Sequence, residues 1–515
     1  MCKDEKLKVE CRMSEIGCQK LESNLRSLSC LRPPILGHEM NANYQPVTPP
    51  IVAELKALVG EQHVIYGEPE RMLDYSHDEV ADPAYVHMPE VVVKPDSAEQ
   101  ISAILRLANR ERIPVTPRGA GSGLSGGAVP VYGGLLLSLE RMNRIIEIDR
   151  ENLVAVVEPG VVTNDINEAI KEYGLFYAGY PMSVETCFIG GNVAENAGGG
   201  RAIKYGVTGR YVLGLQAVLP TGEIIDLGGK RVKDVTGYDL LHLMIGSEGT
   251  LGIFTRIILR LLPLPRTRVV LLMPFADVPT AIAAVPQIIT GSRIVPASVE
   301  FMDRLSVETA YHHIGERPPR SDIGAMLLVE LDGNTQEQVE ADCNAIVDLC
   351  MEAGALDVYV GNTPTTEKKM WRPRQVMAEA FKAICPVQSI EDIVVPLANI
   401  PRLMPELERL AQRYNVLIPC YGHAADGNLH ATVVKRPETP MQDWQARLPE
   451  ILTELYQVIA RLGGTISGEH GIGSKRARYL PLVMDPALMA LQRRIKQAFD
   501  PNGILNPGKI FPSSL

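Results

Sequence analysis

The sequence has few cysteines and no long apolar run, and each shortage excludes a class of protein. Nine cysteines among 515 residues are too few for a secreted scaffold held together by disulfides. No stretch reaches the roughly 20 apolar residues of a membrane helix. Residues 1–39 contain no apolar segment of the signal-peptide type. We therefore expect reduced thiols and a cytoplasmic protein, with peripheral attachment at the inner face of the membrane as the variant of that location.

Positive charge is also scarce, because 51 lysines and arginines face 61 aspartates and glutamates, which gives a net charge of -10. A nucleic-acid-binding protein normally presents a basic face, so no nucleic acid partner is expected. The 46% of hydrophobic and 22% of charged residues are values of a globular protein with a large core. Disorder and fibrous repeats are thereby excluded for the chain as a whole.

Residues 1–39 differ from the rest of the chain. They hold four of the nine cysteines, Cys2, Cys11, Cys18 and Cys30, without any Cys-x-x-Cys pair. Iron–sulfur motifs use tighter spacing, so a cluster is not expected here. We interpret residues 1–39 as a disordered extension ahead of the first domain.

The remainder divides at a proline-rich joint, Leu262-Pro263-Leu264-Pro265. Short helices and strands alternate before the joint, and a capping-box spacing, Ser97 to Gln100, begins one of the helices. After the joint, long helices around 277–290, 335–353, 399–413 and 443–462 alternate with strands around 267–273, 325–331, 389–396, 416–421 and 429–434. This order predicts an α+β fold whose second half has a mainly antiparallel sheet.

A glycine-rich loop at 117–127 contains Gly121, Gly123 and Gly126 in the spacing of a dinucleotide-binding fingerprint, with Glu140 about 20 residues further on. That fingerprint requires a crossover helix after the loop, and only Gly127–Gly134 separates the loop from the next strand. We therefore reject a Rossmann unit. The loop can still hold a pyrophosphate through successive backbone N–H groups, with Arg118 adding charge.

Two further glycine-rich segments follow in the same half. Residues 189–200 read Ile-Gly-Gly-Asn-Val-Ala-Glu-Asn-Ala-Gly-Gly-Gly, and residues 245–253 read Ile-Gly-Ser-Glu-Gly-Thr-Leu-Gly-Ile. Glycine allows the backbone to approach a ligand closely. Three such segments in one half of the chain indicate a long ligand that lies along the backbone.

With the loop 117–127, the segments 181–200 and 245–253, and the tail Phe499–Lys509, the chain resembles the FAD-linked oxidases of the vanillyl-alcohol-oxidase type. The most similar branch contains D-lactate dehydrogenase and the FAD subunit of glycolate oxidase. The resemblance covers roughly residues 50–511. It implies a two-subdomain FAD-binding domain at 40–265, an α+β substrate (cap) domain at 266–480, and a C-terminal segment, 481–515, that returns to the FAD domain.

The resemblance also implies which residues hold the FAD. Some relatives attach FAD covalently through a histidine in the first loop, but 117–127 contains none, so FAD is expected to be dissociable. The implied FAD-binding residues are, for the pyrophosphate, Arg118, Gly119, Ala120, Gly121, Ser122, Gly123, Gly126 and Gly127; for the ribityl chain and the isoalloxazine, Pro181, Met182, Ser183, Thr186, Gly190, Gly191, Asn192, Asn196, Gly198, Gly199 and Tyr205; for the adenosine half, Glu248, Gly249 and Ile253; and, from the tail, Asn506.

The second half carries histidines in two glycine-bounded loops. His423 and His430 flank the turn signal Asp426-Gly427, and folding back there brings the two histidines near one another. Glu469 and His470 lie in a later loop. Two histidines and Glu469 form a three-ligand set of the catalytic kind, which suits Zn, Fe or Mn. The family usually has glycine where this chain has Ala425, and this departure touches no proposed ligand.

This set predicts the oxidation of a 2-hydroxy acid. The hydroxyl and one carboxylate oxygen would chelate the metal, His470 would act as the general base, and hydride would pass to the flavin. Arg374, four residues into a segment expected to begin a helix, resembles the family's carboxylate-binding arginine. Ala378 replaces a hydroxyl residue of relatives that take dicarboxylic acids, which favours D-lactate or glycolate.

Three alternatives remain open from the sequence. The substrate can be D-2-hydroxyglutarate, or the chain can be a transferase like the flavin-dependent alkyl-glycerone-phosphate synthases. The transferase requires an apolar tunnel, which an aromatic content of 5% does not support. A third interpretation is a subunit of a larger electron-transfer complex. The chain has no iron–sulfur or NAD motif, so we expect electrons to leave through an electron-transferring flavoprotein, an iron–sulfur subunit or a quinone.

Overall fold

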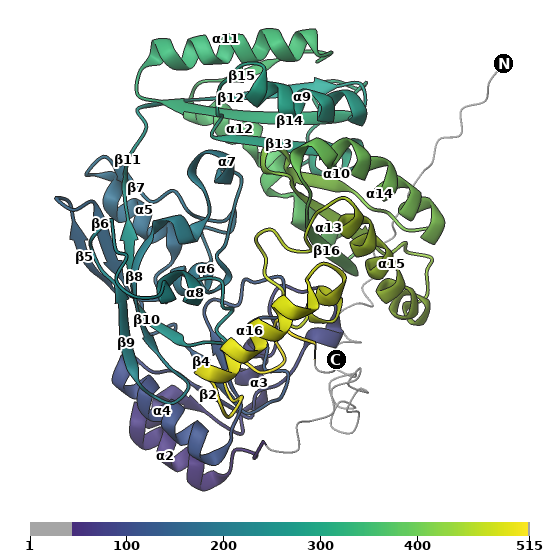
Figure 1. The fold of residues 1–515 in the computed structure, drawn as a ribbon. Coiled ribbons are helices and arrows are strands. Elements are labelled where there is room, and N and C mark those ends of the chain that lie inside the picture. Colours follow the sequence, from purple (N-terminus) through teal and green to yellow (C-terminus); the bar gives the residue numbers. More distant parts are fainter. Residues whose placement is uncertain (1–43, 513–515) are drawn as a thin grey trace. The chain divides into compact units, whose positions relative to one another are not determined.

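The computed structural model describes residues 44–512, so the prediction made for residues 1–39 lies outside the described part. The described chain forms three main sheets and a two-stranded ribbon, with helices packed on their faces (Figure 1). These elements confirm the predicted α+β class.

The first sheet has four strands in the order β1-β2-β4-β3. Its strands are β1 (Val64–Ile65), β2 (Val91–Val93), β3 (Val115–Arg118) and β4 (Leu135–Ser138), and the helices of this region are α2 (Pro49–Val59), α3 (Pro69–Met72) and α4 (Ala98–Glu111). β3 and β4 are parallel although no helix connects them, as the rejection of a Rossmann unit predicted. Ser97 caps α4 as predicted, but the side chain of Gln100 accepts from Asp96 N rather than completing the capping box.

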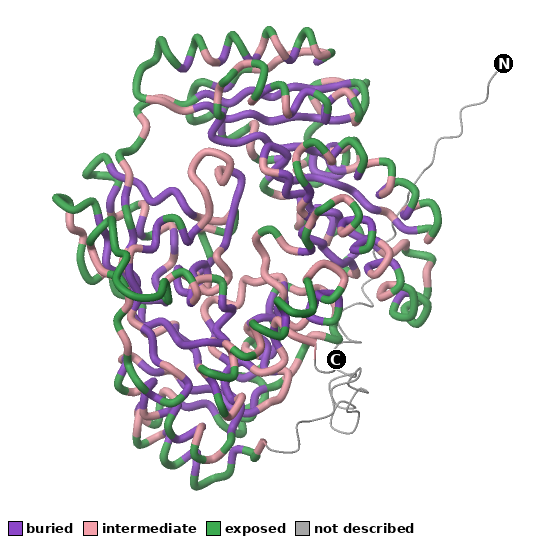
Figure 2. The backbone as a smooth tube through the Cα atoms, in the orientation of Figure 1, coloured by how far each residue is buried: buried purple, intermediate pink, exposed green. Residues whose placement is uncertain are grey.

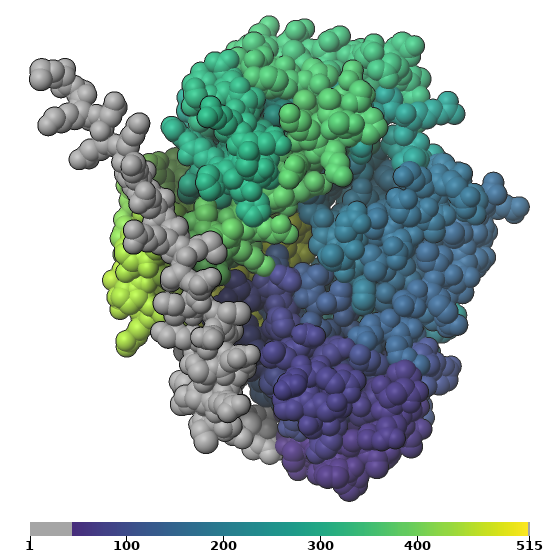
Figure 3. Space-filling view, turned by 180° about the vertical axis from the view of Figure 1, so that it is seen from behind, coloured from purple at the N-terminus to yellow at the C-terminus, as the bar shows by residue number. Residues whose placement is uncertain are grey.

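The second sheet has five antiparallel strands in the order β5-β6-β10-β8-β9. Its strands are β5 (Ile145–Asp149), β6 (Val154–Val157), β8 (Val212–Val218), β9 (Ile224–Gly228) and β10 (Ile253–Arg260). The neighbouring elements are α5 (Thr163–Lys171), α6 (Ile189–Glu195), α7 (Ala202–Tyr205), α8 (Leu240–Met244) and the ribbon of β7 (Leu175–Phe176) with β11 (Leu262–Pro263). The first and second sheets meet where Ser102 of α4 hydrogen-bonds to Gly222 O, and Figure 3 shows these purple and blue regions in contact.

The third sheet has seven strands, all antiparallel, in the order β15-β12-β14-β13-β17-β18-β16. This arrangement confirms the mainly antiparallel sheet predicted for the second half. The strands are β12 (Thr267–Phe275), β13 (Ser298–Asp303), β14 (Ala325–Gly333), β15 (Tyr359–Gly361), β16 (Gln388–Val394), β17 (Cys420–His423) and β18 (Asn428–Val434). The helices are α9 (Val278–Thr290), α10 (Arg304–His313), α11 (Gln336–Glu352), α12 (Pro364–Gln375), α13 (Met377–Ile384), α14 (Ile400–Tyr414) and α15 (Met441–Arg461).

The two faces of this third sheet differ in character. One face forms a large apolar core with α9, α11, α14 and α15, and the central strands are buried throughout (Figure 2). The other face packs against α10, α12 and α13 and combines apolar with charged side chains. Cross-strand pairs place Glu300 opposite His423, and place both Asp392 and Tyr421 opposite His430. Because paired residues point to the same side of a sheet, the polar residues of four strands gather on one face.

A late segment of the chain packs on the first sheet. After α16 (Pro486–Phe499), Leu505 forms a parallel bridge with Val115, and Ile504 and Leu505 enter the core of that sheet. Within residues 44–512 no helix is both long enough and apolar enough to cross a membrane.

Candidate functional site

A tight hairpin holds the first two histidines of the site. His423 ends β17 and His430 lies in β18, with their ring centroids 5.5 Å apart. The intervening turn places Gly427 at φ 83°, where a Cβ would collide with Val395 O, so glycine is required there. Ala425 is not among the residues with positive φ, which explains why alanine is tolerated in place of the family's usual glycine.

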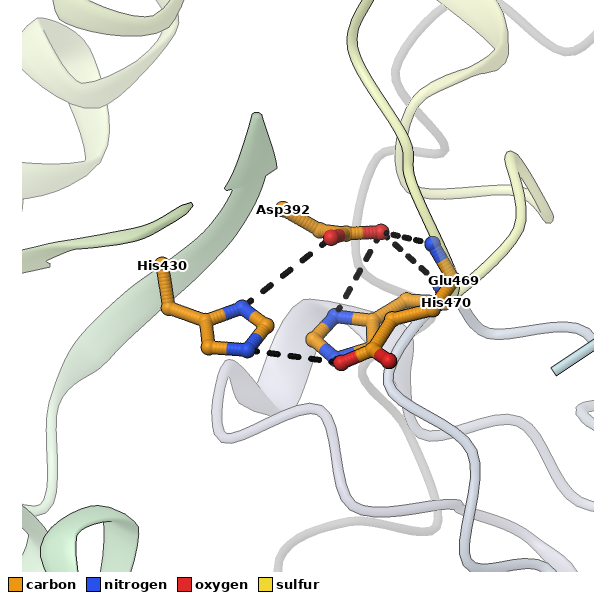
Figure 4. Close-up of side chains that lie close together, drawn as sticks. All are labelled: Asp392, His430, Glu469 and His470. Carbon is orange, nitrogen blue, oxygen red and sulfur yellow. Dashed lines mark hydrogen bonds and ion pairs between the residues drawn. The ribbon is translucent and has the colours of Figure 1, made fainter. Parts of the chain in front are cut away.

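The carboxylate of Glu469 joins this hairpin to the later loop. Its Oε1 lies 3.4 Å from Nε2 of His423, 3.3 Å from Nε2 of His430 and 3.7 Å from Nε2 of His470. The rings of His430, from β18, and His470, from the later loop, are parallel, with centroids 5.1 Å apart. Figure 4 shows both side chains next to Glu469. The structure thus brings together the four residues that the sequence singled out from two loops about 40 positions apart.

These distances are those of ligands that share one ion. Two ligand atoms bonded at about 2.1 Å to a tetrahedral ion lie about 3.4 Å apart. The three atoms proposed as ligands come from His423, His430 and Glu469, and Nε2 of His423 is buried without a hydrogen-bond partner among the described residues. The donor set of imidazole and carboxylate therefore fits a divalent metal, and Zn, Fe and Mn all accept it.

Asp392, in β16, was not predicted from the sequence and fixes the loop that carries Glu469. Its Oδ2 accepts hydrogen bonds from the backbone N–H groups of Gly468, Glu469 and His470 at 2.8–2.9 Å and from Ser467 Oγ at 2.8 Å. The same carboxylate lies 4.0 Å from Nδ1 of both His430 and His470 (Figure 4). Asp392, His430, Glu469 and His470 also form a group able to hold a metal ion. Two adjacent carboxylates, Glu391 and Asp392, inside a predicted strand are the signal that could have identified it.

Glu300, in β13, was also missed by the sequence analysis. Its Oε1 lies 2.6 Å from Nδ1 of His423, and its Oε2 accepts a hydrogen bond of 2.6 Å from Nε of Arg374. Arg374 lies in the last turn of α12, which begins at Pro364, so the predicted helix start just before Arg374 was wrong. The side chain is buried, and its Nη2 has no hydrogen-bond partner within the described chain. One edge of the guanidinium is therefore held by Glu300, and the other is available to a ligand.

Burial and neighbouring charge shift the pKa values of the site in opposite directions. Burial favours the neutral form of Glu300, but the charges of His423 and Arg374 outweigh it and lower the pKa of Glu300 to about 2. Burial lowers the pKa of His470 to about 4, although the Asp392 carboxylate opposes this. His470 is therefore neutral near pH 7 and has a lone pair with which to accept a proton.

The first glycine loop presents unused backbone donors. From Ala120 to Ser125, no backbone N–H donates a hydrogen bond to another group of residues 44–512. The buried guanidinium of Arg118 donates to the carbonyls of Asp74 and His77, so it links the start of this loop to residues 74–77. A run of free N–H groups in a glycine-rich turn fits an anionic pyrophosphate.

The second glycine segment runs between the two halves of the chain. Gly190 and Gly191 lie in α6, where a Cβ on Gly191 would meet nothing within 4 Å. A Cβ on Gly198 would lie 3.2 Å from Glu469, and one on Gly200 would lie 2.5 Å from Glu300 Oε1. The glycines thus let the backbone of the first half reach the histidine and carboxylate cluster of the second.

The other residues predicted to bind FAD fall into distinct environments. Several have side chains already engaged: Asn192 donates to Thr163, Asn196 accepts from Gly209 N, and Tyr205 donates to Asp332. Met182, Ser183 and Thr186 lie on an exposed turn, and Pro181 is partly buried next to them. A Cβ on Gly199 would lie 2.6 Å from Tyr180 O, so a side chain does not fit there.

The third segment contacts the later loop through Glu248. Its carboxylate accepts hydrogen bonds from Ile472 N at 2.8 Å and Gly473 N at 2.6 Å, directly after His470. Asn506 donates to the carbonyls of Gly127 and Glu248, and its Oδ1 is buried with no partner among the described residues. Gly249 has φ 64°, and Ile253 is buried in the core. Asn506 therefore joins the first and third segments, with an acceptor left for a ligand.

Comparisons with known proteins identify the family and the fold of the chain. Residues 89–228 match the family described as "FAD binding domain", and residues 264–510 match "FAD linked oxidases, C-terminal domain". The chain is 41% identical to the glycolate oxidase subunit GlcD of Bacillus subtilis, covering 85% of this chain and 92% of that protein. It is 38% identical to a D-lactate dehydrogenase of Anaerostipes hadrus, covering 91% and 98%. The crystal structure of p-cresol methylhydroxylase superposes with a TM-score of 0.73 at 20% identity, covering 89% and 96%, and so shares the fold.

Proposed function

The chain belongs to the FAD-linked oxidases, and we propose that it is an FAD-dependent dehydrogenase that oxidises a small D-2-hydroxy acid, D-lactate or glycolate, to the 2-oxo acid. The observation that carries this proposal is the convergence of three imidazoles on Oε1 of Glu469. Glu300 bridges Arg374 to His423, so a carboxylate-binding group and a metal-binding group belong to one site.

Each group of the site has a task in this reaction. His423, His430 and Glu469 would hold the divalent metal, which supplies a Lewis acid that lowers the pKa of the substrate hydroxyl. Arg374 would bind the substrate carboxylate through Nη2. His470, neutral because of its burial, would accept the hydroxyl proton. When bound, FAD supplies the acceptor for the hydride that leaves C2.

FAD would be held without a covalent bond by the three glycine segments. The free N–H groups of Ala120–Ser125 support a pyrophosphate site, and the unpartnered Asn506 Oδ1 supports a ligand contact at the tail. The glycines that admit Glu469 and Glu300 lie in the segment proposed for the isoalloxazine. Cofactor and substrate groups are therefore assigned to adjoining stretches of backbone.

The electron acceptor is assigned to a partner. An electron-transferring flavoprotein, an iron–sulfur subunit or a quinone would take the electrons from the reduced flavin. A quinone would place the protein at the inner face of the membrane, and either protein partner would be met in the cytoplasm. Copurification from a native extract distinguishes the protein partners from a quinone.

D-2-Hydroxyglutarate is the second candidate substrate. Ala378, in α13, provides no hydroxyl for a distal carboxylate, which favours the smaller acids. A lipid transferase resembling alkyl-glycerone-phosphate synthase would show no net oxidation. Turnover of an artificial electron-accepting dye separates it from the dehydrogenase.

The test is anaerobic mixing of the purified, FAD-loaded protein with D-lactate, glycolate and D-2-hydroxyglutarate, alongside metal analysis. We expect D-lactate or glycolate to bleach the yellow flavin band and one divalent ion to copurify with each chain. A flavin that stays yellow with all three acids would show that the substrate class is wrong.

A further inference from the structure

Glu300 contacts both the proposed metal ligand His423 and the proposed carboxylate-binding Arg374. It is fully buried at 0% exposure and lies opposite His423 in the β13–β17 ladder. Ser298 Oγ donates a hydrogen bond of 3.1 Å to the same Oε1 that faces His423. Its position is therefore set by the strand register and by three hydrogen-bonding neighbours.

The contact to His423 determines which imidazole nitrogen can bind metal. An ionised carboxylate only accepts hydrogen bonds, so Nδ1 of His423, 2.6 Å away, must carry the proton. When the ring is neutral, as metal binding requires, its lone pair therefore lies on Nε2, the nitrogen that faces Glu469 at 3.4 Å. Glu300 thereby selects the tautomer of His423 that is able to ligate an ion.

The contact to Arg374 constrains the same carboxylate from the other side. Nε of Arg374 donates to Oε2 at 2.6 Å, and a guanidinium has no acceptor atom and cannot change its protonation. Only a group that accepts at both ends satisfies both neighbours at once. Glutamate does so, and glutamine does not, because its amide offers one acceptor and one donor end.

We propose that Glu300 is a positioning residue that couples metal binding at His423 to the orientation of Arg374 by accepting a hydrogen bond from each. This inference rests on the proposed function for the roles of His423 and Arg374. Arg374 fixes which end of residue 300 faces it, and residue 300 in turn fixes the tautomer of His423.

The proposal predicts an unusual dependence of one substitution on another. In Glu300→Gln, the amide oxygen turns toward Arg374, which can only donate. The amide NH₂ group then faces Nδ1 of His423, so the ring moves its proton to Nε2 and loses its ligand lone pair. In an Arg374→Met background no donor competes, and the glutamine oxygen can accept from Nδ1 of His423 as the carboxylate does.

The experiment is a titration of FAD-loaded, metal-stripped protein with Mn²⁺, in which free Mn²⁺ is followed by electron paramagnetic resonance. We expect Glu300→Gln to weaken Mn²⁺ binding by roughly ten- to hundredfold. Added to Arg374→Met, the same change should weaken it less than threefold. An equal loss in both backgrounds, or Mn²⁺ affinity in Glu300→Gln within threefold of the original protein, would overturn the proposal.

Glu367→Gln is the matched control. Glu367 is a buried carboxylate of α12, the helix of Arg374, and its Oε2 accepts a hydrogen bond of 2.8 Å from Nε of Arg268. Glu367 contacts neither His423 nor Arg374, so the Mn²⁺ affinity of the Glu367→Gln variant should stay within twofold of that of the original protein. A loss equal to that of Glu300→Gln would mean that neutralising any buried carboxylate has this effect, and the proposal would fall.

Gly200→Ala disturbs Glu300 without changing it. The added methyl would lie 2.5 Å from Oε1 of Glu300, and the backbone of Gly200 is not in the left-handed region. We expect at least a tenfold loss of Mn²⁺ affinity, and an unchanged affinity would contradict the proposal. The Mn²⁺ measurements do not depend on turnover, so an absence of hydroxy-acid oxidation would overturn the proposed function alone.

Discussion

At the residue scale, two carboxylates that do not belong to the proposed ligand set hold the site in place. Asp392 accepts four hydrogen bonds from the loop 467–470, and Glu300 holds His423 and Arg374. Both carboxylates are completely buried. A buried charge is stable only where hydrogen bonds or opposite charges compensate it. Each of these two carboxylates therefore fixes the positions of the groups that bond to it.

Asp392→Asn tests this arrangement. The amide cannot accept at Oδ2 from the loop and at Oδ1 from Asn428 Nδ2 together, so one set of partners is lost. We expect a loss of about 1.5–3 kcal/mol in the free energy of unfolding, measured in urea. The rate of flavin reduction should fall at least tenfold because the loop carries Glu469 and His470.

Asp303→Asn provides the comparison for that experiment. Asp303 accepts from Ser306 N at the start of α10 and from Cys420 N at the opposite end of β17 from His423. The Asp303→Asn substitution should lower the free energy of unfolding, while flavin reduction continues at the original rate. If Asp303→Asn slows reduction as much as Asp392→Asn does, the special role of Asp392 is refuted.

The buried side chain of Lys475 should make the free energy of unfolding depend on pH. Burial lowers the pKa of its ammonium to about 8, although Glu391 lies 3.0 Å away. The unfolded chain has a lysine pKa near 10.4, so between about pH 8 and 10.4 the unfolded state binds more protons. Stability contributed by this residue must therefore rise with pH in that window, by at most about 1.4 kcal/mol per pH unit.

The measurement compares urea unfolding of the original protein and Lys475→Met at pH 7.5 and 9.5. We expect the original protein to gain stability relative to the variant as the pH rises. A relative loss over the same interval would show that the ammonium is stabilised in the folded protein, contrary to this account.

At the element scale, local pattern predicted most helices and strands, and long-range pairing accounts for what was missed. The hairpin of His423 and His430 was predicted because Asp426-Gly427 is a local turn signal. Glu300 and Asp392 reach the site only because β13 pairs with β17 and β16 pairs with β18. A single sequence does not specify those pairings, so no local rule could associate these carboxylates with the histidines. The helix containing Arg374 was misplaced because Pro373 lies inside α12 instead of near its start.

Gly427→Ala tests the hairpin as an element. A side chain at φ 83° is strained, and its Cβ would collide with Val395 O. We expect a loss of about 2 kcal/mol or more in the free energy of unfolding, together with weaker metal binding. Both are measured on the purified variant, by urea unfolding and Mn²⁺ titration.

Ala425→Gly is the paired control in the same turn. Its backbone has no positive φ, so glycine fits the turn, removes one buried methyl group and makes the unfolded chain more flexible. Stability should fall by about 1–2 kcal/mol, with metal binding retained. Equal effects of the two substitutions would mean that the turn geometry does not position His423 and His430.

At the scale of the whole molecule, the two halves of the chain meet through specific polar contacts. Glu248 holds the loop after His470, Arg201 pairs with Glu330, and Tyr205 donates to Asp332. The order of the segments could be predicted from sequence by resemblance to the family. The contacts that Glu248 and Tyr205 make between the two halves could not be predicted, because they depend on how separately folded parts of the chain pack against one another.

Glu248→Gln distinguishes two tasks for this residue, since the resemblance assigned it to FAD. Glutamine has one acceptor oxygen for the two N–H groups of Ile472 and Gly473. If Glu248 mainly positions the loop, flavin content should be kept while reduction of bound flavin slows by roughly ten- to hundredfold. Loss of flavin, with normal reduction of the fraction that remains bound, would instead assign Glu248 to the cofactor.

The most direct test of the central claim is the rate of flavin reduction by D-lactate or glycolate as metal-stripped, FAD-loaded protein is titrated with Mn²⁺. We expect negligible reduction without metal and full reduction at one ion per chain. In His430→Asn, which lacks one of the proposed ligands, reduction should stay negligible at the same Mn²⁺ concentration. Flavin reduction that proceeds equally well in the stripped original protein would show that no metal takes part.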